Sequence, residues 1–239
     1  MNNVDELVIF SVSDSTYLPF TRVLFNSIKC NVKTPYKFHL HTVNVPDKKI
    51  NFFKDTYENI EVTVDKIELD EKPDFNNSFN KSKKAAYCAN IRAKGIHDLM
   101  MRGCKYILYL DADSIVRKDL NQLLEMIKNT DMIIATRKES LKIRSKVLTG
   151  VIGINNNLNS LKFVDLWKSL VLNELSLYRW YTDQVMFTKA MEENIINITD
   201  LPLEYIDTAR FVGGSFIWCG KGDRKFGNTK YIQEMEKYK

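Results

Sequence analysis

The chain has few cysteines, no long apolar run and no secretory signal pattern. Its four cysteines, Cys30, Cys88, Cys104 and Cys219, show no CxxC spacing, so neither a zinc site nor a disulfide framework is predicted. No apolar run approaches the roughly 18 residues of a membrane-spanning helix, and the polar first residues lack the layout of a secretory signal. We therefore expect a soluble, cytoplasmic protein with free thiols.

The chain also lacks a large excess of charge of one sign. It has 35 lysines and arginines against 30 aspartates and glutamates, a net charge of +5 at pH 7. The basic residues are interspersed with acids and form no aromatic-rich recognition module, so the composition fits an anionic small ligand better than nucleic acid. No linker, repeat or low-complexity tract divides the chain, and one domain is expected over residues 1–239.

Short apolar runs alternate with stretches of helical spacing along the chain. Strands are predicted for residues 7–12, 36–43, 60–69, 106–110, 132–136, 147–154, 194–198 and 215–219. Helices are predicted for residues 20–28, 49–57, 84–102, 120–127, 158–172 and 182–191. This alternation implies an α/β fold, in which helices cover both faces of a mostly parallel sheet. Ligands of such sheets bind beyond the carboxyl ends of the strands.

Two closely spaced aspartates, Asp111 and Asp113, directly follow the strand predicted at residues 106–110. Carboxylates at the end of a strand offer the hard oxygen ligands that Mg²⁺ and Mn²⁺ prefer, and such an ion would bridge the oxygens of a diphosphate. Its charge would help a nucleoside diphosphate to leave when a sugar bond breaks. The alternative is that the two aspartates only start a turn and cap the next helix.

Five stretches, in this order, resemble glycosyltransferases of the GT-A type, and family 8 among them. They are VIFSVSDSTYLPFTRVLFNSI, ANIRAKGIHDLM, KYILYLDADSIVRKDLNQLL, WYTDQVMF and IWCGKGDRK, which together run from residue 8 to residue 225. The resemblance implies a GT-A, Rossmann-like fold with a UDP-sugar at the carboxyl ends of the strands. It also implies a Mn²⁺ or Mg²⁺ ion and the transfer of a hexose to a carbohydrate hydroxyl, with retention of the anomeric configuration.

The resemblance gives roles to three residues in the first half of the chain. Asp14 would accept a hydrogen bond from uracil, and Tyr17 would stack on that base. Arg92 would contact the donor sugar and the nearby carboxylates. On the residues alone, Asp14 can instead start a helix with Tyr17 packed on it, and Arg92 can be a solvated surface residue.

Two segments in the second half of the chain receive roles in the same way. Asp183 would accept hydrogen bonds from sugar hydroxyls, and Gln184 would lie near the anomeric carbon; the alternative is an exposed polar turn. The basic residues Lys221, Arg224 and Lys225 accompany two glycines. Such a flexible segment can close over a diphosphate and stabilise the leaving group, or it can be a solvated tail.

The sequence departs from the family pattern at two places. A metal-binding histidine is usual just before the glycines of the basic segment, but Cys219 stands here, and sulfur is a poor ligand for Mg²⁺. The usual Asn-Ala-Gly reads Leu148-Thr149-Gly150, so the choice of donor or acceptor is expected to differ. The three histidines, His39, His41 and His97, are expected to be structural or exposed.

Two other functions stay open. An inverting GT-A enzyme shares the fold and the paired aspartates but needs a carboxylate base for the acceptor, and product stereochemistry separates the two. The missing histidine also fits a nucleotide-sugar-binding protein that has lost catalysis. A nucleotidyltransferase is disfavoured, because no glycine-rich phosphate loop follows the first predicted strand.

Overall fold

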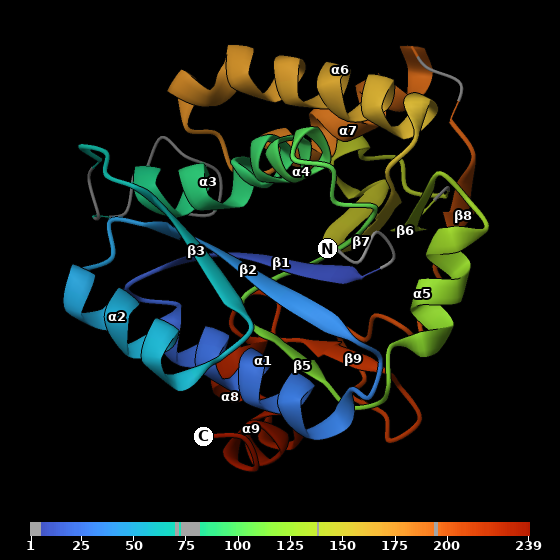
Figure 1. The fold of residues 1–239 in the computed structure, drawn as a ribbon. Helices are drawn as coiled ribbons and strands as arrows, with labels where there is room; N and C mark the ends of the chain where they lie inside the picture. The colour runs from blue at the N-terminus through green and yellow to red at the C-terminus, as the bar shows by residue number, and fades with distance from the viewer. Residues whose placement is uncertain (1–5, 70–71, 73–81, 138, 194–195) are drawn as a thin grey trace.

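The computed structural model describes residues 6–69, 72, 82–137, 139–193 and 196–239, and these form an α/β structure around a seven-stranded sheet. The strand order is β3-β2-β1-β4-β7-β6-β8 (Figure 1). The strands are β1 (Leu7–Asp14), β2 (Tyr36–Val43), β3 (Ile60–Asp65), β4 (Tyr106–Leu110), β6 (Met132–Thr136), β7 (Val147–Asn155) and β8 (Ile198–Asp200).

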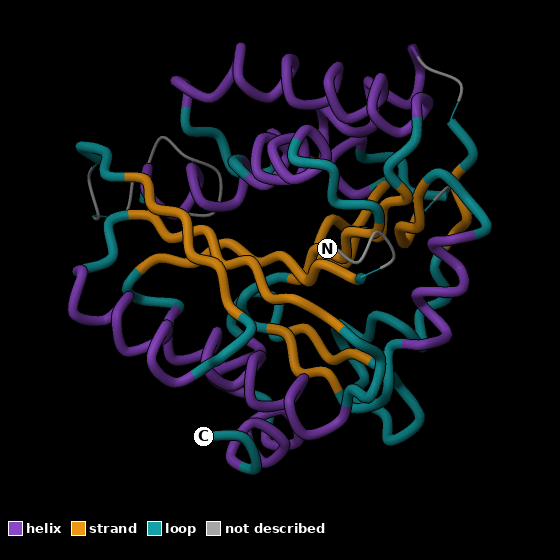
Figure 2. Tube along the Cα trace, in the orientation of Figure 1, coloured by secondary structure: helices purple, strands orange, loops and turns teal. Residues whose placement is uncertain are grey.

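The sheet is mostly parallel, as the sequence predicts. Within the described residues, β7 runs antiparallel to its neighbours β4 and β6, and the other neighbouring strands pair in parallel. A second, two-stranded antiparallel sheet joins β5 (Ser114–Val116) to β9 (Ile217–Cys219), as Figure 2 shows in orange. This small sheet brings the end of the chain to the residues that follow β4.

Helices cover both faces of the large sheet (Figure 1). On one face lie α3 (Lys83–Asn90), α4 (Arg92–Met101), α6 (Leu158–Glu174) and α7 (Thr182–Glu193), and on the other α1 (Leu18–Asn31), α2 (Asp47–Thr56) and α5 (Asn121–Lys128). The short α8 (Arg224–Gly227) and α9 (Thr229–Glu236) end the chain beside α1. None of the helices in the described ranges is both long and apolar enough to cross a membrane.

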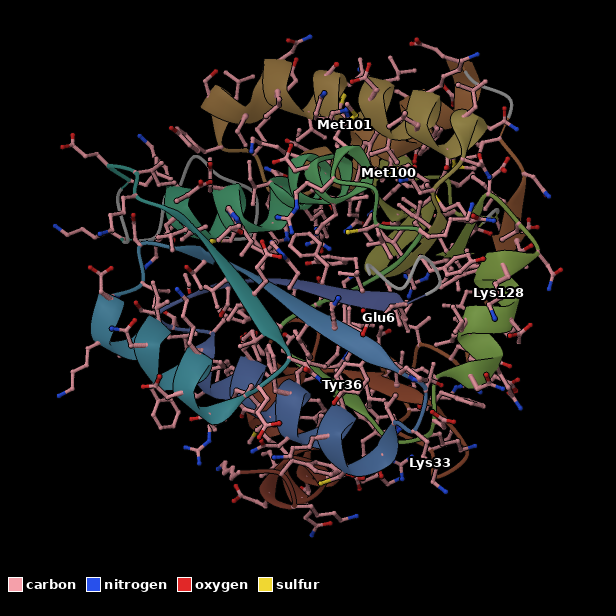
Figure 3. All side chains as sticks on the ribbon, viewed as in Figure 1. Glu6, Lys33, Tyr36, Met100, Met101 and Lys128 are labelled. Atoms are coloured by element: carbon pink, nitrogen blue, oxygen red, sulfur yellow. The ribbon has the colours of Figure 1, made fainter. Side chains whose placement is uncertain are left out.

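The apolar residues of the strands point alternately into two cores. Leu7 and Ile9 of β1 pack with α1, while Val8 and Phe10 pack with α4, because successive side chains of a strand face opposite sides. Side chains fill the space between the sheet and each helical layer (Figure 3). Burial on both faces explains why the strands read as continuous apolar runs.

The largest difference from the sequence-based expectation concerns the helix predicted at residues 84–102. It is broken at Ile91 into α3 and α4. Arg92 Nε donates to the carbonyl of Ala89 at 2.6 Å, an acceptor that a continuous helix gives to a backbone N–H. The break turns the Arg92 side chain toward the end of the sheet.

Smaller differences concern strand bounds. The strand predicted at 60–69 ends at Asp65, and β5 covers residues to which the sequence assigned no element. The prediction for 194–198 includes residues 194–195, which lie outside the described residues, and β8 starts only at Ile198. Short strands of three residues carry too few side chains for a periodic signal.

Candidate functional site

A cavity of about 600 Å³ opens beyond the ends of β1 and β4. Its walls come from β1, β7, α3, α4 and α7, from the residues after β4, and from the segment after β9. Of the ten site residues predicted from the sequence, all except Arg224 line it: Asp14, Tyr17, Arg92, Asp111, Asp113, Asp183, Gln184, Lys221 and Lys225. The fold therefore gathers residues that lie more than 200 positions apart in the chain.

The possible metal site lies where β4 ends. One ligand atom each of Asp111, Asp113 and Cys219 fall within 4.8 Å of one another, and Cys219 is placed there by the pairing of β9 with β5. Asp113 and Cys219 are buried, whereas the Asp111 side chain is 29% exposed toward the cavity. The two carboxylates fit the Mg²⁺ or Mn²⁺ ion that the sequence predicts, whereas the sulfur suits a softer divalent cation.

Arg92 is buried between two carboxylates. Its Nη1 donates to Asp111 Oδ1 at 2.8 Å and to the Thr149 carbonyl at 2.7 Å, and its Nε lies 3.4 Å from Asp183 Oδ2. Burial disfavours its charge, but Tyr109, Asp111 and Asp183 outweigh that effect and raise the pKa of Arg92. The interpretation of Arg92 as a solvated surface residue is therefore wrong.

Asp183 and Gln184 begin α7 and are also buried. The Thr149 hydroxyl donates to Asp183 Oδ2 at 2.8 Å, and the Asp183 N–H donates to Asn90 Oδ1 at 3.0 Å. Burial raises the pKa of Asp183, and the Arg92 guanidinium opposes this shift. The Gln184 amide, with its nitrogen turned toward the backbone, donates to the Arg144 and Val147 carbonyls at 2.7 and 3.0 Å. An exposed polar turn is excluded by this burial.

Asp14 forms the turn before the first helix, whereas α1 itself begins at Leu18 with Tyr17 as its N-cap. Its Oδ1 accepts the backbone N–H groups of Thr16 and Tyr17, both at 2.9 Å, and this fixes the turn that leads into α1. Its Oδ2 faces Lys84 Nζ at 3.7 Å. Tyr17 lines the cavity, and burial raises the pKa of its hydroxyl.

The basic segment is not a solvated tail at Lys225. This buried lysine lies 2.6 Å from Asp113 Oδ2 and donates to the Tyr17 hydroxyl at 2.9 Å. Burial disfavours the charge of Lys225, but Asp113 outweighs it and raises the pKa of the lysine. Lys221 lines the cavity, whereas the Arg224 guanidinium donates to the Thr208 carbonyl at 2.6 Å and lies outside the cavity lining.

Several lining residues received no role from the sequence. Lys84 is only 2% exposed, yet a lysine in a helix carries no sign of burial in the sequence. Thr149 was noted only as a departure from the family pattern, but it bridges Arg92 and Asp183. Trp180 and Tyr181 also line the cavity, and the resemblance of the WYTDQVMF stretch was the only signal for them.

The histidines lie away from the cavity lining, in agreement with the sequence prediction. His41 Nε2 is 3.0 Å from Asp65 Oδ2, and His39 lies beside Thr63 on the neighbouring strand. Burial lowers the pKa of His39 to about 4. His39 and His41 therefore help to pack β2 against β3, whereas His97 of α4 lies beside Asp165 and Lys168 of α6.

Comparisons with known proteins agree with this fold. The sequence profile described as glycosyl transferase family 8 matches residues 8–169. The solved structure of the galactosyltransferase LgtC with donor and acceptor sugar analogs has a TM-score of 0.65 at 14% identity, covering 97% of this chain and 96% of LgtC. No curated protein matches the chain in sequence.

Two further solved structures share the fold. The glycosyltransferase GlyE of Streptococcus pneumoniae TIGR4 has a TM-score of 0.64 at 14% identity over 96% of this chain, which spans only 60% of the GlyE chain. Mouse xyloside xylosyltransferase 1 has a TM-score of 0.57 at 14% identity, covering 92% of this chain and 98% of its own. At such identities the likeness concerns the GT-A fold alone.

Proposed function

Since the chain belongs to glycosyl transferase family 8 and is a glycosyltransferase, we propose that it moves a hexose from a UDP-sugar to a hydroxyl group of a carbohydrate. The observation that carries the proposal is the cavity itself. It brings paired aspartates, a buried arginine between carboxylates and three lysines to the strand ends of a mostly parallel sheet. That set of charges suits a sugar with hydroxyl groups at one end and a diphosphate at the other.

In this proposal Asp111 and Asp113 hold a Mn²⁺ or Mg²⁺ ion. A bound divalent ion would neutralise the charge that develops on a departing diphosphate. Lys225, beside Asp113, and Lys221 on the cavity wall would supply further positive charge for the same phosphates. Arg224, bound to the Thr208 carbonyl, would hold this segment in place.

The donor sugar would lie against Asp183 and Gln184. Asp183 would accept hydrogen bonds from sugar hydroxyls, while Arg92 and Thr149 fix its orientation. Gln184 would lie near the anomeric carbon. We propose retention on the strength of the family membership: the acceptor would attack the face that the diphosphate leaves, and the leaving phosphate would take the acceptor proton.

The base would be uracil, placed between Tyr17 and Asp14. Tyr17 lies on the cavity wall, where an aromatic ring can stack on a flat base. One carboxylate oxygen of Asp14 already accepts the backbone N–H groups of the turn before α1. The other oxygen, which faces Lys84, would therefore accept the N–H of the base. LgtC was solved with donor and acceptor sugar analogs, which supports a donor site in this fold.

The test is a panel of nucleotide sugars assayed for release of the nucleoside diphosphate, with and without Mn²⁺, in the presence of simple saccharides. Metal-dependent turnover of one UDP-sugar, with product of retained configuration, supports the proposal. Inverted product would show the inverting mechanism instead. Tight binding of a nucleotide sugar without any release of diphosphate would identify a binding protein.

A further inference from the structure

The cysteine beside the paired aspartates has an unusual environment. Cys219 is 1% exposed, and its Sγ lies 3.6 Å from Asp113 Oδ1 and 3.9 Å from Asp111 Oδ2. A divalent cation placed between these atoms would have one sulfur and two carboxylate oxygens as ligands.

In Asp111 and in Asp113, the two carboxylate oxygens have different partners. Asp111 Oδ1 accepts from Arg92 and from the Tyr109 hydroxyl, at 2.8 and 2.9 Å, and its Oδ2 faces the sulfur. Asp113 Oδ2 holds Lys225 at 2.6 Å, and its Oδ1 faces the sulfur. In both residues the oxygen that holds no side-chain cation is the one turned toward Cys219.

The backbone keeps these three groups together. Cys219 pairs with Ser114 between β5 and β9, the Gly220 N–H donates to the Asp113 carbonyl at 2.9 Å, and the Tyr231 hydroxyl donates to the same carbonyl at 2.7 Å. Gly150 leaves the space open, because a Cβ at that position would lie 2.8 Å from Asp111 Oδ2 and 3.5 Å from the sulfur.

The spacing fits one shared ion. Zinc–sulfur bonds of about 2.3 Å and zinc–oxygen bonds of about 2.0 Å, at a tetrahedral angle, put sulfur and oxygen roughly 3.5 Å apart. The two separations in this chain, 3.6 and 3.9 Å, are close to that value.

We propose that Cys219 is a third protein ligand of the metal, and that its sulfur makes the site prefer thiophilic divalent ions such as Zn²⁺, Co²⁺ and Cd²⁺ to Mg²⁺, with Mn²⁺ between them. The inference rests on the metal dependence proposed above. On binding, a sulfur lone pair forms the bond to the metal and the thiol proton leaves to the solvent. No electron transfer is involved.

The test uses Co²⁺ and Cd²⁺, whose thiolate complexes absorb in the near ultraviolet. The purified protein is titrated with each ion, and the charge-transfer band is expected to saturate at one equivalent. A matched control replaces Cys30, Cys88 and Cys104 by serine and should keep the band, since Cys219 remains. Cys219→Ser should lose the band and bind Co²⁺ at least roughly 10-fold more weakly, with Mg²⁺ binding little changed.

A second measurement needs no variant, in case Cys219→Ser does not fold. X-ray absorption of the unaltered protein with one equivalent of Zn²⁺ should show a sulfur neighbour at about 2.3 Å. A first shell of oxygen and nitrogen alone overturns the inference, and so does a band that survives in Cys219→Ser.

The same preparations separate this inference from the proposed function. Sugar transfer with Mg²⁺, combined with oxygen-only coordination of Zn²⁺, would reject the sulfur ligand and keep the glycosyltransferase assignment with its UDP-sugar donor. A saturable Cys219 band without turnover of any nucleotide sugar would keep the sulfur ligand and reject the proposed reaction.

Discussion

The two sides of the cavity are built in different ways. On the sheet side, Arg92, Asp111, Thr149 and Asp183 form one network in which Arg92 bridges the other three. The other side is the segment 217–225, which runs from β9 to Lys225 and contacts the paired aspartates through Cys219 and that lysine. Three of the four network residues lie within the part of the chain that matches the family profile, and the segment lies outside it.

This difference assigns different tasks to the two sides. A network of paired buried charges is rigid, and removing one partner leaves another charge buried without compensation. The segment carries two glycines, and Gly222 has a φ of +66°, which a residue with a Cβ adopts at a cost. We infer that the sheet side fixes the donor sugar, while the segment sets how the metal and the diphosphate are held.

The strongest way to break this comparison is to change Asp113, the aspartate that holds Lys225 of the segment. Asp113→Asn should lower kcat/KM for sugar transfer on the order of 10³-fold, because the metal loses a charged ligand. It also leaves the buried Lys225 without a carboxylate, so the melting temperature should fall. Steady-state kinetics over a range of Mn²⁺ concentrations and thermal unfolding measure the two effects.

A matched control separates stability from chemistry. The double variant Asp113→Asn with Lys225→Met removes both charges of the pair and should recover part of the lost stability, while transfer stays low. Undiminished Mn²⁺-dependent turnover in Asp113→Asn would show that the metal site lies elsewhere.

The next largest effect is expected at Lys225 itself. Lys225→Ala should lower kcat roughly 10²-fold and change donor affinity much less, since a fixed cation acts mainly on charge that develops in the transition state. Rapid-quench or steady-state assays at saturating donor give kcat, and calorimetry gives the affinity. Equal losses in affinity and in kcat/KM, with kcat unchanged, would make Lys225 a ground-state binding residue.

The sequence predicts the sheet side better than the segment, for physical reasons. The strand at residues 106–110 is a continuous apolar run followed at once by Asp111 and Asp113, so a local pattern marks both the strand and its charged end. The contact of Cys219 with those aspartates depends on two strands of three residues that pair across more than 100 positions. No periodicity reveals such a pairing.

The burial of charged side chains could not be predicted from the sequence either. Lys84 and Arg92 lie on helices whose spacing alone predicts solvent exposure, and only the packing of α3 and α4 over the sheet buries them. Arg92 is the first residue of α4, and its side chain donates to the Ala89 carbonyl and to Asp111. Tertiary contacts decided these positions over local propensity.

A smaller effect is expected for the base. Tyr17→Ala should weaken UDP binding by roughly 10-fold, since stacking on an aromatic ring contributes about 1–3 kcal/mol. Tyr17→Phe keeps the ring but loses the hydrogen bond with Lys225, so UDP affinity should be nearly retained. Calorimetry with UDP and GDP measures both points, and tighter binding of GDP than of UDP would show that the uracil assignment is wrong.

The smallest loss of kcat is expected for Arg224→Ala. This variant tests whether Lys221, Arg224 and Lys225 act separately or whether their whole segment moves over the diphosphate. Arg224 donates to the Thr208 carbonyl and does not line the cavity, whereas Lys221 does. If the segment stays as the structure shows it, Arg224→Ala should change kcat less than about twofold, as is usual for surface changes. The loss of kcat in Lys221→Ala should then lie between the losses in Arg224→Ala and Lys225→Ala. Lys221 places a charge on the cavity wall, but its removal does not leave a buried carboxylate without its partner, as the removal of Lys225 does. Measuring kcat at saturating donor for the three alanine variants side by side gives this order directly. An Arg224→Ala loss as large as that of Lys225→Ala would mean that the whole segment closes over the diphosphate during turnover, with Arg224 leaving Thr208 to reach the phosphates.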